Sequence, residues 1–182
     1  YSSRNKYALK NVSFDIHKGE KVSIIGKNGA GKSTVAKLIC GIIRPQSGVI
    51  NIKGKNYINM SISQIGRLVG YVMQNPNQML VKDMIKDEIA LTLTLNNFEQ
   101  SVIDERVEKV LKMTGLYPMR NWPVSVLSYG QKKRITIASI LVLEPEVIIL
   151  DEPTAGQDLK HYTEIMSFID EIKRKSDIAI VF

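Results

Sequence analysis

A glycine-rich segment near the N-terminus constrains the fold of this chain more than any other feature. Residues 26–34 read GKNGAGKST, which matches the phosphate-loop pattern G-x-x-x-x-G-K-[ST]. The segment follows the β-branched run 21–25, typical of a buried strand, and precedes residues 33–39, which have helical spacing. A glycine-rich turn at a helix N-terminus presents unpaired N–H groups and a positive dipole end to an anion. The sequence therefore predicts a phosphate-binding loop in an α/β fold.

A pair of carboxylates ends a second buried run. Asp151 and Glu152 directly follow the apolar residues 147–150, which indicate another strand. In the loop pattern, the lysine at Lys32 reaches the outer phosphates and the hydroxyl at Ser33 binds Mg²⁺. The loop and the carboxylates together describe an ATPase, so ATP and Mg²⁺ are the predicted cofactors.

Length, composition and charge are those of an ordinary globular protein. The 182 residues are 44% apolar, which is enough to bury one core. The net charge of +7 is compatible with a nucleic acid, an anionic membrane face or a nucleotide, so charge alone does not identify a partner. The single cysteine, Cys40, lies in the apolar helix after the phosphate loop and is expected to be a buried thiol. No apolar stretch approaches the roughly 20 residues of a membrane span.

The helix and strand patterns divide the chain into two parts. Residues 1–74 and 128–182 alternate strand-like runs with helices, which predicts an ATP-binding α/β core with a mainly parallel sheet. Residues 75–127 show mostly helical spacing, so we expect an inserted helical subdomain there. Strands are expected at 11–16, 21–25, 48–53, 68–73, 147–150 and 178–182, and helices from Lys32, from about Ser63, from Ser128 to about Leu143 and over 158–175. Within the subdomain, Ser101 and Asp104 predict a capping box for a helix that ends at Gly115.

Residues 127–134, LSYGQKKR, resemble the signature motif of the ATP-binding cassette (ABC) family. The phosphate loop, the lone glutamine Gln74, this motif, the Asp-Glu pair and a downstream loop at 155–158 follow one another in the order of that family. The resemblance covers nearly the whole chain. It implies an α/β phosphate-loop NTPase core with an inserted helical subdomain, truncated at the C-terminus, and ATP hydrolysis as the activity.

The resemblance also implies a role for each motif residue. Lys32 would neutralise phosphate oxygens, while Ser33 and Gln74 would offer oxygens to Mg²⁺ and Asp151 would hold the ion through a water. Glu152 would be the general base that orients the attacking water, so Glu152, Lys32 and Gln74 are the catalytic candidates. Tyr1 stands where the family has an aromatic that stacks on the purine ring. Backbone N–H groups would form the phosphate cradle at Asn28, Gly29, Ala30, Gly31, Lys32, Ser33 and Thr34.

In the ABC fold, the signature motif completes the site of a partner. Ser128, Gly130 and Gln131 would contact the nucleotide held by a second cassette, because a helix starting at Ser128 would point its N-terminus at that γ-phosphate. The expected assembly is a head-to-tail ATP sandwich with an identical or a different cassette. Considered alone, Ser128 is better explained as a plain N-cap, but next to the other motifs the contact with a partner's nucleotide is favoured.

The chain departs from the family pattern at a few positions. Tyr129 occupies a place where many members have glycine, and Gln157 replaces a common aliphatic residue. The family's switch histidine is absent, because His17 and His161 stand elsewhere and are expected to be surface residues. A fragment that stops before this histidine is expected to hydrolyse ATP poorly.

Residues 69–78 resemble the Gln-Asn-Pro segment of energy-coupling-factor importers, whose ATPases power the uptake of vitamins and transition-metal ions. In these importers the stretch between Asn77 and Ala90 would form a groove for a helix of an integral membrane subunit. The residues expected either to line that groove or to pack in the subdomain core are Met79, Leu80, Val81, Met84 and Ile85. The cassette would then lie peripherally at the cytoplasmic face of the membrane, with no transmembrane segment of its own.

Soluble ABC ATPases of the DNA-repair or translation-factor type are the alternative. Repair ATPases separate the motifs with a long coiled coil, for which the interval between Gln74 and Ser128 is too short. Translation factors carry two cassettes in one chain, joined by a charged linker. The sequence of one cassette leaves open that it comes from such a protein. The Gln-Asn-Pro segment and the absence of a zinc-type cysteine set favour transport, with no nucleic-acid partner. The transported substrate is not encoded here, because a membrane or capture subunit selects it.

Overall fold

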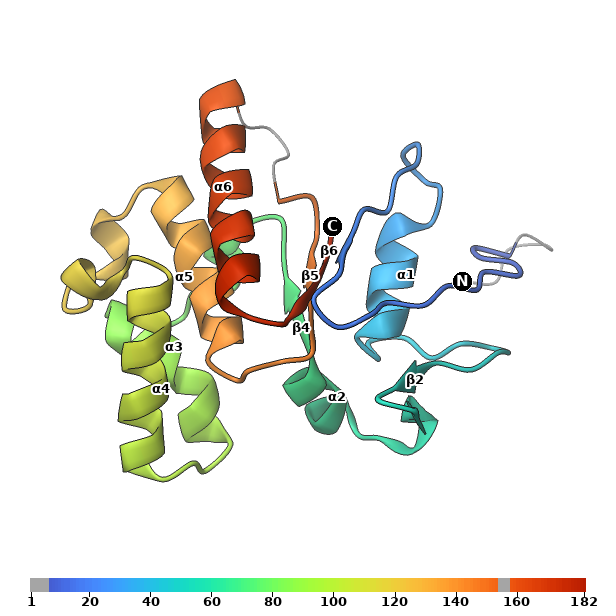
Figure 1. The fold of residues 1–182 in the computed structure, drawn as a ribbon, viewed down its shortest axis with the longest axis horizontal. Helices are drawn as coiled ribbons and strands as arrows, with labels where there is room; N and C mark the ends of the chain where they lie inside the picture. Colours follow the sequence, from blue (N-terminus) through green and yellow to red (C-terminus); the bar gives the residue numbers. More distant parts are fainter. Residues whose placement is uncertain (1–6, 154–157) are drawn as a thin grey trace.

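A four-stranded parallel sheet forms the centre of the molecule. The computed structural model describes residues 7–153 and 158–182. The strands lie in the order β1 (Lys21–Val22), β6 (Ala179–Val181), β5 (Val147–Leu150) and β4 (Val69–Val72), and each neighbouring pair is parallel (Figure 1). The predicted α/β fold with a mainly parallel sheet is therefore confirmed.

The other elements surround this sheet. The helices are α1 (Lys32–Ile39), α2 (Ile62–Leu68), α3 (Ile85–Leu95), α4 (Gln100–Met113), α5 (Tyr129–Leu141) and α6 (Leu159–Lys175). Short 3-10 helices lie at Tyr57–Asn59, Pro76–Gln78, Tyr117–Met119 and Val124–Val126, and a small antiparallel ribbon joins β2 (Asn51–Ile52) to β3 (Lys55–Asn56). No helix in the described ranges combines the length and hydrophobicity that a membrane span requires.

The two faces of the sheet are covered by different helices. Along β5, Ile149 packs with Ala36 and Cys40 on the α1 side, because successive side chains of a strand point to opposite faces. Ile148 and Leu150 pack on the other side with residues of α5 and α6. Cys40 is buried, as expected. Burial raises the pKa of its thiol to about 12, with a smaller contribution from Asp151, so the thiol stays neutral and structural.

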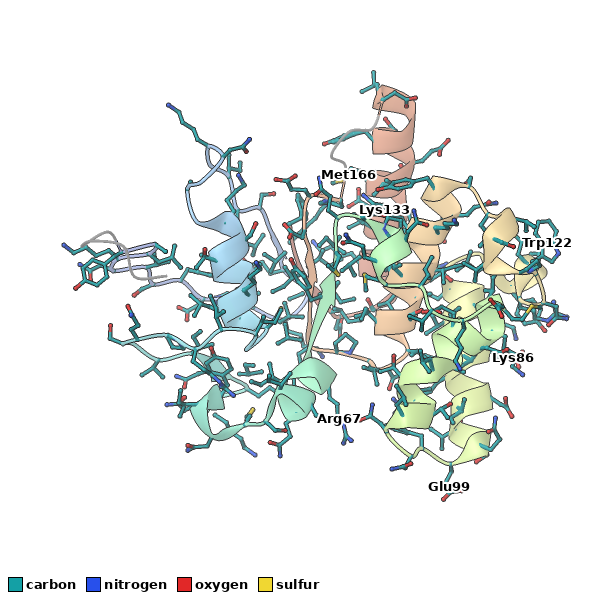
Figure 2. The ribbon with its side chains drawn as sticks, turned by 180° about the vertical axis from the view of Figure 1, so that it is seen from behind. Arg67, Lys86, Glu99, Trp122, Lys133 and Met166 are labelled. Atoms are coloured by element: carbon teal, nitrogen blue, oxygen red, sulfur yellow. The ribbon has the colours of Figure 1, made fainter. Side chains whose placement is uncertain are left out.

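The described chain between β4 and α5 is mostly helical. Buried side chains of α3 and α4, among them Ile89, Leu93 and Val107, share one cluster with Ile135 of α5. In Figure 2, the half-exposed Trp122 lies at the outer edge of this part, away from the sheet. The helical content expected for 75–127 is present, while its treatment as a separate subdomain remains a prediction.

Two predicted details of secondary structure are wrong. Residues 11–16, all within the described part of the chain, form no strand, because no strand of the described residues pairs with them and Val12 and Phe14 are exposed. The capping box at Ser101 is also absent. A tight turn with Asn97 at positive φ starts α4 at Gln100, so Ser101 already lies inside the first turn.

The predicted end of α4 at Gly115 is confirmed. Gly115 has φ +70, its N–H donates to the Lys112 carbonyl, and the Leu116 N–H donates to the Leu111 carbonyl at 2.9 Å. This pair of bonds is a Schellman motif, which requires a residue that tolerates the left-handed conformation.

Replacing Gly70 with alanine should destabilise the fold. Gly70 lies in β4 beneath α5, where an added Cβ would stand 2.0 Å from Cγ2 of Ile140. Overpacking of this kind costs about 1–3 kcal/mol, so we expect a lower thermal midpoint by differential scanning fluorimetry of the full-length protein. Gly66→Ala is the matched control, because nothing lies within 4 Å of its added Cβ. Equal midpoints for the two variants would contradict the packing described for β4 and α5.

Candidate nucleotide site

The phosphate loop links the end of β1 to the start of α1, as its pattern predicts. Gly29 and Gly31 have φ of +82° and +97°, in the left-handed region. A larger residue at position 31 would displace its neighbours, because an added Cβ would lie 2.8 Å from Cδ2 of Leu9 and 3.1 Å from the Ala8 carbonyl oxygen. Lys32 Nζ donates to the carbonyl oxygens of Gly26 at 2.8 Å and Lys27 at 3.3 Å. These bonds fold the ammonium group over the loop, where it can meet a phosphate.

The remaining cradle residues are accessible to a ligand. Asn28, Gly29 and Ala30 are exposed, and Ser33 is exposed in the first turn of α1. Thr34 is half-buried behind it. The loop therefore offers its backbone and the Ser33 hydroxyl to solvent at a helix N-terminus, as a phosphate site requires.

Asp151 is held at the end of β5 by two contacts with β4. Its N–H donates to the Val72 carbonyl at 2.9 Å, and its Oδ2 accepts a hydrogen bond of 2.5 Å from the Tyr71 hydroxyl. Burial, strengthened by the Asp151 carboxylate, raises the pKa of Tyr71, so the phenol is a protonated donor at neutral pH. Tyr71 binds only Oδ2, so the other carboxylate oxygen of Asp151, Oδ1, does not take part in this hydrogen bond.

Glu152 and Gln74 are brought together, although they are far apart in the sequence. Gln74 follows β4, and its Nε2 donates to Glu152 Oε2 at 3.2 Å. Glu152 is exposed and has φ of +46°, an uncommon conformation for a residue other than glycine. Since the amide nitrogen of Gln74 binds Glu152, its amide oxygen remains available as a metal ligand.

These residues come from the carboxyl ends of strands of the same parallel sheet. The phosphate loop follows β1, Gln74 follows β4 and Asp151 follows β5. Ligand sites of open α/β sheets lie at this edge. The candidate donors are one hydroxyl, one amide and one carboxylate, an all-oxygen set that suits Mg²⁺ bound together with phosphates. The described residues contain no cluster of three or more His, Cys, Asp and Glu side chains that could hold a metal by themselves.

The signature residues begin α5. Ser128 Oγ accepts from the Gln131 N–H at 3.3 Å, and Gln131 Oε1 accepts from the Ser128 N–H at 2.9 Å, which together form a capping box. The N-cap explanation of Ser128 is therefore correct, and its hydroxyl hydrogen can still be donated to a ligand. Gly130 is half-buried, and no atom of the described residues lies within 4 Å of the position of an added Cβ.

Sequence reasoning missed the contacts that tie α5 to the loops of the site. The Tyr129 hydroxyl donates to the Gln74 carbonyl at 3.2 Å, and Lys132 Nζ donates to Asn77 Oδ1 at 3.1 Å. Lys133, which is buried, donates to the Pro153 carbonyl. The first turns of α5 thus contact both the glutamine loop and the segment after Glu152. The only signal in the sequence was Tyr129 itself, as a departure from glycine.

Some predicted positions lie outside the described residues. Tyr1 and residues 155–157, including Gln157, belong to this group, and the side chain of His161 is not described either. His17 is exposed, as expected.

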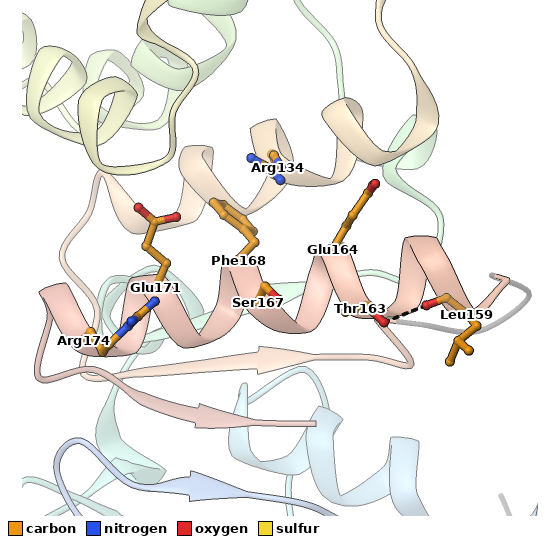
Figure 3. A pocket seen from close by; sticks show the side chains of 8 residues that line it. All are labelled: Arg134, Leu159, Thr163, Glu164, Ser167, Phe168, Glu171 and Arg174. Carbon is orange, nitrogen blue, oxygen red and sulfur yellow. Dashed lines mark hydrogen bonds between the residues drawn. The ribbon is translucent and has the colours of Figure 1, made fainter.

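A hollow of about 810 Å³ elsewhere does not belong to the nucleotide site. Figure 3 shows its lining residues, with the Arg134 guanidinium above the Phe168 ring at 4.8 Å and Thr163 Oγ1 bonded to the Leu159 carbonyl. The lining comes from α6 and from Arg134 of α5, and it includes none of the predicted phosphate or metal ligands.

The chain is similar to several known proteins. The family model "ABC transporter" matches residues 9–155. An Enterococcus faecalis protein assigned as an ABC transporter ATP-binding protein is 59% identical over 96% of this chain, and a Clostridium perfringens protein assigned likewise is 54% identical over 94%. The chain spans about a third of the length of these curated relatives, 31% and 30% respectively.

A solved structure matches closely as well. It is cbiO1 of Clostridium perfringens, part of the ABC transporter complex cbiONQ, with a TM-score of 0.89 and 37% identity over 96% of this chain and 70% of that one. The α/β fold, the order of the motifs along the sheet edge and these matches lead to the same conclusion. The chain belongs to the ABC transporter family, as an ATP-binding cassette of the ABC ATPase fold.

Proposed function

We propose that this chain is the nucleotide-binding cassette of an ATP-driven importer of the energy-coupling-factor type. The observation that carries the proposal is the similarity to cbiO1 over nearly the whole chain, together with the Gln-Asn-Pro residues that follow β4. The runner-up, a soluble repair or translation ATPase, has less support because the relatives are assigned to transporters.

The site residues divide the chemistry between them. The loop N–H groups and Lys32 would hold the triphosphate, while Ser33, Gln74 and Asp151 would hold Mg²⁺. The ion would neutralise charge on the phosphate oxygens. Glu152 would orient the attacking water and take its proton, and the hydrogen bond from Gln74 would keep the carboxylate beside the metal site.

The start of α5 supports a composite site shared with a second cassette. The described residues do not require glycine at Gly130, because none of them occupies the position of an added Cβ. An open glycine beside the helix N-terminus at Ser128 would let the phosphates of a facing nucleotide approach the backbone closely. ATP would then be bound between Lys32 of one cassette and Ser128 of the other.

A hollow of about 390 Å³ near the glutamine loop supports docking of a membrane subunit. Its lining includes Leu80, Val81 and Lys82 from the predicted docking segment and Pro123 to Ser125 opposite them. Val81 is 71% exposed, whereas Ile85 is fully buried and Met79 and Leu80 pack partly against the core. Val81 therefore offers an accessible apolar contact, and Ile85 serves the core.

Glu88 holds this segment in shape. Its buried carboxylate accepts hydrogen bonds from the N–H groups of Val81 at 2.9 Å and Lys82 at 2.6 Å. A fixed apolar segment beside polar groups suits a helix delivered by a partner. The cassette would then be bound at the cytoplasmic face of the membrane.

Purifying the tagged full-length protein from solubilised membranes tests this proposal. We expect an integral membrane subunit to accompany the wild type and to be lost from Val81→Glu, because a charge in the hollow would be desolvated on docking. Leu95→Glu is the matched control, since Leu95 is 73% exposed but lies outside the hollow. Absence of any membrane subunit with the wild type would argue against transport, and equal retention by both variants would argue against this docking surface.

A further inference from the structure

The register of the sheet places a tyrosine beside the metal-site carboxylate. Tyr71 pairs with Ile149 across β4 and β5, so its side chain lies on the α1 face of the sheet. Asp151 follows Ile149 by two positions, and side chains two apart on an extended chain share a face. The Tyr71 hydroxyl reaches Asp151 Oδ2 at 2.5 Å, while the Asp151 N–H is fixed by the Val72 carbonyl.

This hydrogen bond restricts the carboxylate. The backbone bond fixes the Cα of Asp151, and the phenol fixes one carboxylate oxygen, which together limit rotation of the side chain. The other oxygen is left for the metal or its water. Groups that bind a metal ligand from behind in this way orient the ligand, and their loss typically costs about 10- to 100-fold in metal affinity.

We propose that Tyr71 is a positioning residue that orients Asp151 for Mg²⁺ and so sets the concentration of Mg²⁺ that ATP binding requires. The inference rests on the proposed nucleotide site, and it deepens that site by assigning a role to a residue that had none among the phosphate and metal ligands. Tyr71 does not touch the nucleotide itself; it acts through Asp151.

The Tyr71→Phe variant of the full-length protein isolates the hydroxyl, because the ring that packs in the core is kept. Binding of a fluorescent ATP analogue is titrated at a series of free Mg²⁺ concentrations and in EDTA. We expect unchanged affinity in EDTA and about a 10-fold or greater increase in the Mg²⁺ concentration for half-maximal binding. In the Asp151→Asn background, Tyr71→Phe should cause no further shift.

Tyr57→Phe separates positioning from a general structural effect. Tyr57 is also buried on the α1 side, and its hydroxyl donates to the Leu38 carbonyl at 2.8 Å, away from Asp151. This variant should lower the thermal midpoint without moving the Mg²⁺ dependence. An unchanged Mg²⁺ dependence in Tyr71→Phe, or an equal shift in Tyr57→Phe, would overturn the inference. Failure of the wild type to bind ATP with Mg²⁺ would instead overturn the proposed function.

Discussion

Replacing Glu152 with glutamine in the full-length protein is expected to stop ATP turnover while ATP remains bound between two cassettes. Glutamine has nearly the same shape as glutamate, so it can keep the hydrogen bond from Gln74 and the backbone conformation at φ of +46°. It cannot take a proton from the attacking water. Loss of a general base lowers the rate by about 10²- to 10⁴-fold. Phosphate release measures the turnover, and size-exclusion chromatography with ATP and Mg²⁺ measures the trapped assembly.

The glutamine substitution needs a control at the other end of β5. Glu146→Gln changes a carboxylate directly before this strand, where Glu146 binds Lys53 at 2.6 Å. Turnover of this variant should match the wild type. Normal turnover in Glu152→Gln would contradict the role of Glu152, and an equal loss in both variants would indicate a change in folding.

Ser128→Arg is expected to abolish hydrolysis without preventing ATP binding. A nucleotide held by this chain's own Lys32 would be unaffected, whereas the facing nucleotide would lose a donor and meet a bulky side chain at the N-terminus of α5. Removing one such donor typically costs about 10²- to 10³-fold in turnover. ATP binding and phosphate release, measured on the same preparation, separate the two steps.

Arginine at this position also removes a helix cap, which costs about 1 kcal/mol. Ser61→Arg controls for that cost, because Ser61 caps α2 through the same kind of capping box with Gln64. Both variants should lose similar stability, and only Ser128→Arg should lose turnover. Retained turnover in Ser128→Arg would argue against composite sites. Loss of ATP binding would place Ser128 at the nucleotide of its own cassette.

The parts of the site that the sequence predicted are those that short local patterns define. The phosphate loop needs glycine at positive φ before a helix, as at Gly31, and Asp151 needs only to end a buried strand. The parallel sheet followed from the alternation of strands with helices. Each of these depends on residues near one another in the chain.

The remaining features depend on register and packing, which short patterns do not contain. The contacts of Tyr71 with Asp151 and of Gln74 with Glu152 join residues about 80 positions apart, because β4 lies beside β5. Residues 11–16 have strand-like composition, but no strand in the part of the chain that the structure describes pairs with them. Ile85 fitted a docking groove by its apolar character, yet α3 turns it into the core.

In the proposed composite site, ATP is bound between Lys32 of one cassette and the serine that begins α5 of the facing one. A structure of the full-length Glu152→Gln variant with ATP and Mg²⁺ would reveal whether this arrangement forms. We expect the γ-phosphate within hydrogen-bond distance of Ser128, or of the equivalent serine, of the opposing cassette. A γ-phosphate that faces solvent, with no second cassette in contact, would contradict it.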